Sequence, residues 1–437
     1  MSLKETLVSS FLAFEDHLEH DSPIHEIRSK AIRNFEHKGF PTKKEESWKY
    51  TSLNSIIKKE FNLFPQQDQA VEFKEVKKFF LHDIDTYKVV FIDGIYSSFL
   101  SETTHDSMDI CLLSSAIKKP KYQAVIEAYY NTLADESSLT SLNTAYAKEG
   151  AYIYIPKNKE VEKPIEIINF STGNEAALMM QPRNLIVVGE NAHVQIIERH
   201  QSLTDNEIFT NSVTEIFVED RAYIDYYKIQ NDRVTSSLID STFIRQEKGS
   251  NCRVHTFSFG GGLIRNNLNF IQNGEGCDST LKGITIIENE QHVDHSTLVH
   301  HYAPNCESHQ DYKGLFDDRS TGVFNGKVIV DKEAQKINAF QQNNNILIHD
   351  QATVNAKPQL EIFADDVKCS HGCTIGQFDE EALFYLRTRG IAKKEAQPLL
   401  MYAFANTVLE SVKIPVLKKR INHLIADKIG VNIGFNI

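Results

Sequence analysis

The sequence lacks the features that would assign it to several common protein classes. It contains no run of about 18 apolar residues, so we expect no membrane-spanning helix. The first twenty residues carry Glu5, Glu15 and Asp16 and no continuous apolar core, which excludes a secretory signal peptide. Only six cysteines occur among 437 residues, too few for a disulfide framework. This scarcity indicates a reducing, cytoplasmic location.

The charge balance and the missing nucleotide motifs exclude further functions. The formal net charge is -12 and the isoelectric point is about 5.8, which disfavours binding to a phosphate backbone or an anionic membrane. We therefore expect no nucleic-acid partner. The segment Asn325-Gly326-Lys327 lacks the glycine spacing of a P-loop and the Ser or Thr that follows its lysine. The chain thus has no Walker site of its own.

A short β-rich unit repeats through the middle of the sequence. From about residue 152, apolar runs alternate with turns that contain Gly, Asn or an acidic residue. In four of these units the turn residues Glu190, Glu219, Glu247 and Gly274 are spaced 29, 28 and 27 residues apart. One period has room for two strands, whereas a four-stranded propeller blade needs about 40 residues. The spacing therefore favours a β-solenoid, in which each turn stacks on the previous one.

Helical periodicity flanks this β-rich part on both sides. Upstream, Ser22 is an expected N-cap with Pro23 at the first helical position, and Trp48 is expected to anchor the helices to their neighbour. Downstream, Asp379 is expected to cap a helix that ends at Gly390, and two further helices follow. We divide the chain into an N-terminal helical and mixed region, a parallel β-helix core and a C-terminal helical region, at 1–143, 144–377 and 378–437.

The densest group of metal-binding side chains lies near the end of the β-rich part. Cys369, His371 and Cys373 alternate, so on an extended strand they share one face with neighbours about 7 Å apart. Gly372 favours the alternative of a bulge that breaks this alternation, and many buried cysteines only pack. Structural zinc sites need four ligands, and no C-x-x-C pair occurs. The set is therefore incomplete without ligands from another segment or another chain.

A second group of ionisable side chains lies upstream: His292, Asp294, His295, His300, His301, Cys306 and His309. These residue types bind zinc or exchange protons. On a strand, however, His292 and Asp294 share a face while His295 points the other way, so a common site needs a bend. Solvated strand and loop histidines are the simpler interpretation.

Several segments resemble the SufB/SufD family of iron-sulfur cluster assembly proteins. They are EESWKYTSL (45–53), HSTLVHHYAPNCES (295–308), DYKGLFDDRSTGVFNGKVIVDKEAQKINAFQQNNNILI (311–348), KPQLEIFADDVKCSHG (357–372) and GQFDEEALFYLRTRGI (376–391). SufB members carry a different, Glu-containing sequence in place of Cys369-Ser370-His371-Gly372, so the resemblance excludes the SufB branch. The family usually has Ala where Cys373 stands, which favours a packing role for this thiol.

The resemblance implies a right-handed parallel β-helix between helical regions. It also implies a non-enzymatic subunit that contacts a SufB-like subunit through the β-helix edge and a SufC-like ABC ATPase through the C-terminal helices. Cys369 and His371 match family positions at the SufB/SufD interface. Our hypothesis is that His371, and after it Cys369, binds iron or a nascent iron-sulfur cluster shared with the partner. The cluster or iron is then transient, and the isolated chain holds no stable cofactor.

Two functions from other classes stay open. A β-helix is also the scaffold of polysaccharide lyases and hydrolases, although these are commonly exported and this chain has no signal. A zinc hydrolase is the other alternative, with His292, Asp294, His295 and His300 as its ligands. The sequence does not reveal which ligands the partner supplies, which cluster type forms first, whether this chain binds iron alone, or whether it forms a homodimer in the absence of SufB.

Overall fold

A computed structural model describes residues 2–16, 24–63, 71, 73–81, 83–103, 107–173 and 177–431. The expected N-cap Ser22 and the first helical residue Pro23 lie outside the described residues, and the helix itself is observed from His25 to Lys38. Within the described part, no helix is both long and apolar enough to cross a membrane.

The described residues form two ten-stranded arrangements of mostly parallel strands, here named sheet 1 and sheet 2. Sheet 1 has the order β2 (Ile95–Tyr96), β1 (Tyr87–Ile92), β5 (Ile165–Ser171), β8 (His193–Ser202), β10 (Tyr223–Gln230), β12 (Asn251–Ser258), β14 (Asp278–Ile287), β16 (Glu307–Phe316), β18 (Ile337–Leu347) and β20 (Val367–Gly376). Sheet 2 has the order β3 (Asp109–Leu112), β4 (Ala151–Ile155), β7 (Arg183–Val188), β9 (Ile208–Val218), β11 (Ser236–Gln246), β13 (Leu263–Gln272), β15 (His292–His301), β17 (Thr321–Val330) and β19 (Thr353–Ile362), with β6 (Leu178–Met180) beside β9.

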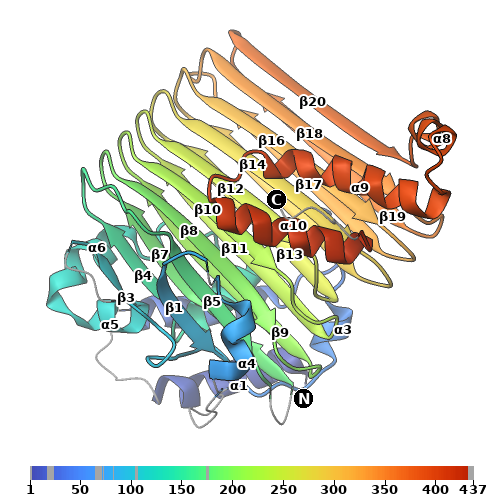
Figure 1. The fold of residues 1–437 in the computed structure, drawn as a ribbon. Helices are drawn as coiled ribbons and strands as arrows, with labels where there is room; N and C mark the ends of the chain where they lie inside the picture. Colours follow the sequence, from blue (N-terminus) through green and yellow to red (C-terminus); the bar gives the residue numbers. More distant parts are fainter. Residues whose placement is uncertain are drawn as a thin grey trace.

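From β7 onward, consecutive strands alternate between the two sheets, so each turn of the chain adds one strand to each (Figure 1). The stacked strands are parallel and in register. Ile224 of β10, for example, lies between Val194 of β8 and Cys252 of β12. The predicted parallel β-solenoid is therefore confirmed. The sheets also extend into the N-terminal region, where β1 pairs with β5 and β3 with β4.

The repeat in the sequence arises from the corners of the solenoid. At one corner, a residue with positive φ stands just before the sheet 1 strands β8, β10, β12, β14 and β16, namely Asn191, Arg221, Gly249, Gly276 and Asn305. Gly adopts this left-handed conformation without steric cost, and Asn tolerates it better than most residues. The Gly and Asn residues at regular spacing are thus the residues that turn the chain.

Helices cover the outer faces of both sheets. The upstream ones are α1 (Leu3–Asp16), α2 (His25–Lys38), α3 (Asn54–Ile57), α4 (Phe73–Val76), α5 (Leu113–Lys118), α6 (Gln123–Tyr129) and α7 (Ser138–Tyr146), with 3₁₀ turns at Glu46–Trp48, Lys77–Phe79 and Pro120–Tyr122. The downstream ones are α8 (Glu380–Thr388), α9 (Lys393–Leu409) and α10 (Pro415–Ile429). Asp379 caps α8 as expected, since its carboxylate accepts hydrogen bonds from two backbone N–H groups.

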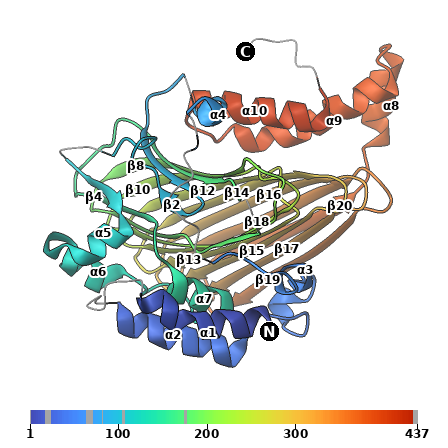
Figure 2. The ribbon, with the colours of Figure 1, turned by 90° about the horizontal axis from the view of Figure 1, so that it is seen from below.

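Apolar side chains on the outer faces hold these helices in place. On sheet 1, Tyr227 and Phe257 pack against α9 and α10 through residues such as Leu417. On sheet 2, Phe209 and Ile239 pack against α1, α2 and α7. Figure 2 shows α9 and α10 on one side of the two sheets and α1, α2 and α7 on the other. The interior between the sheets is therefore closed along its length by two layers of strand and, outside them, by helices.

Candidate functional site at the open edge of the solenoid

The solenoid ends in an open edge formed by β19 and β20. Each is the last strand of its sheet, so within the described residues one side of each strand has no neighbouring strand. The residues of β20 are exposed except for Val367 and Cys369, which are half-buried. Figure 1 shows β20 at one extreme of the strand array with α8 beside its end. Unpaired N–H and C=O groups on such an edge are able to pair with a strand of another chain.

Cys369, His371 and Cys373 lie on the inward face of β20. In the register with β18 they stand beside Ala339, Gln341 and Asn343. These three β18 side chains are buried, whereas the intervening residues are exposed or half-buried. Because stacked parallel strands place paired residues on the same face, the Cys-His-Cys set faces the interior at the open end. The expected shared face is confirmed.

The pairing also decides between the two conformations considered for this segment. It continues without interruption from Val367 to Gly376, so Gly372 does not form a bulge. A Cβ at Gly372 would have no heavy atom within 4 Å. The glycine therefore leaves open space on the outer face of β20, opposite to the face that carries His371.

The two thiols differ in their surroundings. Cys369 packs against an apolar cluster that includes Cys306 and Ala339. Cys373 is exposed, and its Sγ lies 3.8 Å from Asn343 Oδ1. Burial raises the pKa of both thiols, more than the backbone N–H of Ala339 lowers that of Cys369. Both are therefore protonated at neutral pH in the chain alone, and metal binding would release their protons.

His371 is the least engaged of the three ligands. Its side chain is exposed, and within the described residues it takes part in no hydrogen bond or ion pair. Alternate positions along a strand are about 7 Å apart, too far for three of them to surround one metal ion. Among the described residues the Cys-His-Cys set is not one of the groups whose ligand atoms lie within 4.8 Å of one another. The arrangement is therefore an incomplete site that exposes an imidazole.

Apolar side chains are exposed around this edge. They lie on β18, β19, β20, the loop after β19 and the helices that follow: Phe340, Ile362, Phe363, Ile375, Phe384, Tyr385 and Leu399. Phe363 and Phe384 are 63% and 67% exposed. A concentration of exposed apolar groups on a soluble protein marks a contact surface for another macromolecule. Sequence reasoning missed these residues because their exposure depends on which strand is last. The residues just before β20 and the N-cap of α8 give no indication in the sequence that these apolar side chains are exposed.

The second predicted cluster does not form a site. His292 Nε2 and Asp294 both contact the hydroxyl of Thr51 on the outer face of sheet 2, the former at 2.9 Å. His295 points inward, with Nε2 2.9 Å from Thr285 Oγ1. His300 lies further along the strand and pairs with an aspartate in the next turn. Since β15 stays in register with both neighbours, no bend brings these groups together. The geometry required by the zinc hydrolase alternative is absent from this strand.

The outward residues of β15 instead anchor the N-terminal region. Asp294 accepts a hydrogen bond from Arg265 Nη1 at 2.5 Å, and the Arg265 guanidinium lies 4.0 Å from the centre of the Trp48 ring. Trp48 itself is buried. The expectation that Trp48 anchors the helical region is therefore confirmed, and burial lowers the pKa of the neighbouring His292.

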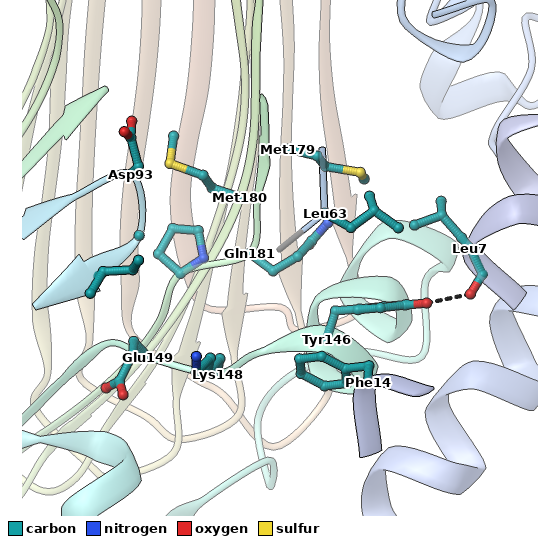
Figure 3. Close-up of a pocket in the computed structure, with 13 residues that line it drawn as sticks. Leu7, Phe14, Leu63, Asp93, Tyr146, Lys148, Glu149, Met179, Met180 and Gln181 are labelled. Carbon is teal, nitrogen blue, oxygen red and sulfur yellow. Dashed lines mark hydrogen bonds between the residues drawn. The ribbon is translucent and has the colours of Figure 1, made fainter. Parts of the chain in front are cut away.

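A cavity of about 310 Å³ lies at the other end of the molecule, between α1, α7 and the first turns of the solenoid. Figure 3 shows Leu7, Phe14 and Tyr146 on one side of it and Met179 and Met180 on the other. The Tyr146 hydroxyl donates to the Leu7 carbonyl. The acidic groups at its rim already have partners, since Asp93 accepts hydrogen bonds from Thr172 and Glu149 from Ser114. The cavity therefore offers apolar surface and no group of converging reactive side chains.

Comparison with known proteins gives matches along most of the chain. The model of the SUF system FeS cluster assembly SufBD core domain matches residues 170–404, and that of the SufBD protein N-terminal region matches residues 1–167. An iron-sulfur cluster assembly SufBD family protein of Synechocystis is 31% identical over 396 residues, or 88% of this chain and 87% of the relative. The iron-sulfur cluster assembly protein SufD of Escherichia coli is 30% identical over 393 residues, or 88% of both chains. SufD of Bacillus subtilis is 27% identical over 318 residues, or 71% of both.

Proposed function

Because the chain belongs to the SufBD family of iron-sulfur cluster assembly proteins, we propose that it acts as the SufD-like subunit of a scaffold complex. In this complex the open edge of the solenoid contacts a SufB-like subunit, and a nascent cluster is built between the two. A SufC-like ABC ATPase contacts the C-terminal helices and supplies the nucleotide site that this chain lacks. The chain itself catalyses no reaction.

The observation that carries this proposal is the incomplete ligand set on an open, apolar edge. A second solenoid end placed against β19 and β20 would pair with their free backbone groups and cover the apolar side chains around them. It would also bring its own ligands toward Cys369 and His371, which face the interior at this end. The unpaired backbone groups, the exposed apolar side chains and the incomplete ligand set are thus all explained by one partner, a second solenoid end.

Within this site we assign the leading role to His371. Its imidazole is exposed and unengaged, so binding iron costs no existing hydrogen bond within the described structure. A neutral imidazole is a good ligand for iron. Cys369 is second, because its thiol is half-buried and must first lose a proton whose pKa burial has raised. We assign no ligand role to Cys373, whose exposed thiol contacts Asn343 at the rim.

The C-terminal helices are suited to pass motion to this edge. β20 ends at Gly376 and α8 begins at Glu380, so only three residues separate the site strand from the helices. Most of α8 is exposed, with Leu383 its one buried residue. A partner that moves α8 therefore acts on β20 almost directly.

We propose that the complex works in the cytoplasm. In that compartment the six cysteines, which are free in the structure, stay reduced.

Reconstitution tests the role of His371. The full chain is combined with the SufB-like and ABC ATPase subunits of its own organism, a sulfur donor and ferrous iron, and cluster formation is followed by visible absorbance. We expect His371→Ala to slow assembly by at least about tenfold, because even the loss of a residue that only supports a metal ligand costs about 10- to 100-fold. Ser370→Ala is the matched control, because Ser370 is the exposed neighbour on the opposite face of β20. Equal assembly by His371→Ala and wild type would show that the assigned role is wrong.

The partners are tested separately by affinity purification from the native host. We expect a SufB-like and an ABC ATPase subunit to accompany the wild-type chain. Recovery of the chain alone, or only as a homodimer, would contradict the proposed complex while leaving family membership intact.

A further inference from the structure

The interior of the solenoid contains a buried group of three metal-binding side chains. Glu198 and His200 lie on β8 of sheet 1, and Asp240 lies opposite them on β11 of sheet 2. Each offers one ligand atom, and the three atoms all lie within 4.8 Å of one another. The distance from His200 Nε2 to Glu198 Oε1 is 3.8 Å. All three side chains are at most 5% exposed, so solvent does not satisfy them.

Two side-chain atoms of this group have no hydrogen-bond partner. His200 Nε2 and Asp240 Oδ1 are both buried and unpaired in the described structure. Most buried polar atoms in proteins are paired, so two unpaired atoms within one group of potential metal ligands require an explanation. The other carboxylate is held in place. Asn184 Nδ2 donates to Glu198 Oε1 at 3.1 Å, and the Tyr226 hydroxyl donates to Glu198 Oε2 at 2.5 Å.

The charge of this interior also favours a cation. Lys228 Nζ lies 2.7 Å from Asp240 Oδ2 and 2.6 Å from Thr242 Oγ1, so the ammonium group holds one oxygen of the aspartate and leaves Oδ1 free. Glu198 and Asp240 carry two negative charges against the single positive charge of Lys228. The carboxylates of this buried group thus outnumber its ammonium group, and a bound cation would offset that difference.

We propose that Glu198, His200 and Asp240 bind a divalent first-row transition-metal ion, such as Fe²⁺, inside the solenoid. One imidazole nitrogen and two carboxylate oxygens suit Fe²⁺, Mn²⁺, Co²⁺ or Zn²⁺ and do not select Cu⁺, which prefers sulfur. Bonds of about 2.0 to 2.2 Å place neighbouring ligand atoms about 3 to 3.5 Å apart, so the group closes around an ion by small side-chain rotations. The site is separate from the open edge and does not depend on the function proposed for it.

Cobalt is the probe, because its spectrum reports the ligand type. The full chain is produced in cells grown with Co²⁺, so that the ion is present while the chain folds around a site that is later closed. We expect about one equivalent of cobalt in the purified protein, with visible ligand-field bands and no thiolate charge-transfer band. In His200→Gln and Asp240→Asn we expect the cobalt content to fall at least about tenfold. His295→Gln is the matched control and should retain cobalt, since His295 is equally interior but both its ring nitrogens have partners.

Three results would overturn the proposal. They are wild-type protein without cobalt, cobalt retained in His200→Gln, and a thiolate band that disappears in Cys369→Ser. The last of these would place the ion at the open edge. X-ray absorption of the wild-type cobalt protein provides a test that does not depend on the folding of any variant. A first shell of nitrogen and oxygen that includes imidazole supports the interior site, and sulfur in that shell refutes it.

Discussion

Replacing Glu215 by Gln should destabilise the whole chain strongly. Glu215 Oε2 pairs with Arg183 Nη2 at 2.6 Å, and both side chains are 0% exposed. The same carboxylate accepts hydrogen bonds from the backbone N–H groups of Asn131, Leu133 and Ala134 at 2.8 to 3.1 Å. It thus fixes the loop between α6 and α7 to sheet 2. Gln preserves the shape but removes the charge, so the buried Arg183 guanidinium loses its counter-ion.

The size of the effect follows from burial. Removing one partner of a fully buried ion pair costs about 3 to 5 kcal/mol, because the remaining charge is left uncompensated away from water. An exposed pair contributes about 0 to 1 kcal/mol. Arg221 and Glu190 form such a pair on successive turns of the same solenoid, with side chains 53% and 44% exposed. Glu190→Gln is therefore the matched control, with the same chemical change at a solvated pair.

The assay is equilibrium unfolding in urea, followed by far-UV circular dichroism and by tryptophan fluorescence from Trp48. We expect Glu215→Gln to lower the free energy of unfolding by about 3 to 5 kcal/mol and Glu190→Gln by less than about 1 kcal/mol. A loss below about 1 kcal/mol for Glu215→Gln would refute the assignment of an uncompensated buried charge. Equal losses in the two variants would do the same.

Two further predictions concern the contact between sheet 1 and the C-terminal helices. Leu417 of α10 is fully buried against sheet 1, so Leu417→Ala should reduce the free energy of unfolding by about 2 to 5 kcal/mol, and protease digestion should then release α9 and α10 before the solenoid is cut. His255 is buried beside Ser411, and burial lowers its pKa from 6.5 to about 3. The unfolded chain therefore binds the proton more readily than the folded one. The stability contributed by neutral His255 is complete above pH 6.5 and is lost as the pH falls toward 3, by about 2 kcal/mol between pH 6.5 and 5. His255→Gln should flatten this part of the pH–stability curve, and an unchanged slope would contradict the explanation.

Much of the solenoid is predictable from sequence because its corners repeat. Residues such as Asn191 and Gly249 are needed where φ is positive, and their regular spacing reveals the length of a turn. The strand alternation then gives the shared face of Cys369 and His371, which the register confirms. These predictions succeed because they rest on local geometry.

Contacts between residues on different strands, and the exposure of residues near the last strand, are not predictable from the sequence. Glu198 and Asp240 are 42 residues apart in the sequence and lie in different sheets, and nothing local indicates that they face each other. The exposure of Phe363 and Phe384 depends on the absence of a further strand after β20 among the described residues. The histidines of β15 suggest a cluster because they are close in sequence. On the strand, however, successive residues point to opposite faces, which separates them.

Because the turns stack in register, the length of the solenoid is proportional to the number of its turns. Parallel strands are spaced about 4.8 Å apart, so each turn moves the open edge by that distance from the first strands of the stack. Deleting one complete turn would shorten the stack while leaving every inward row in place, whereas deleting a single residue from a strand would exchange its inward and outward rows. The length of the molecule can therefore change only in whole turns if the chemistry at its edge is to persist. The distance from the first strands to the open edge is set by the number of turns between them.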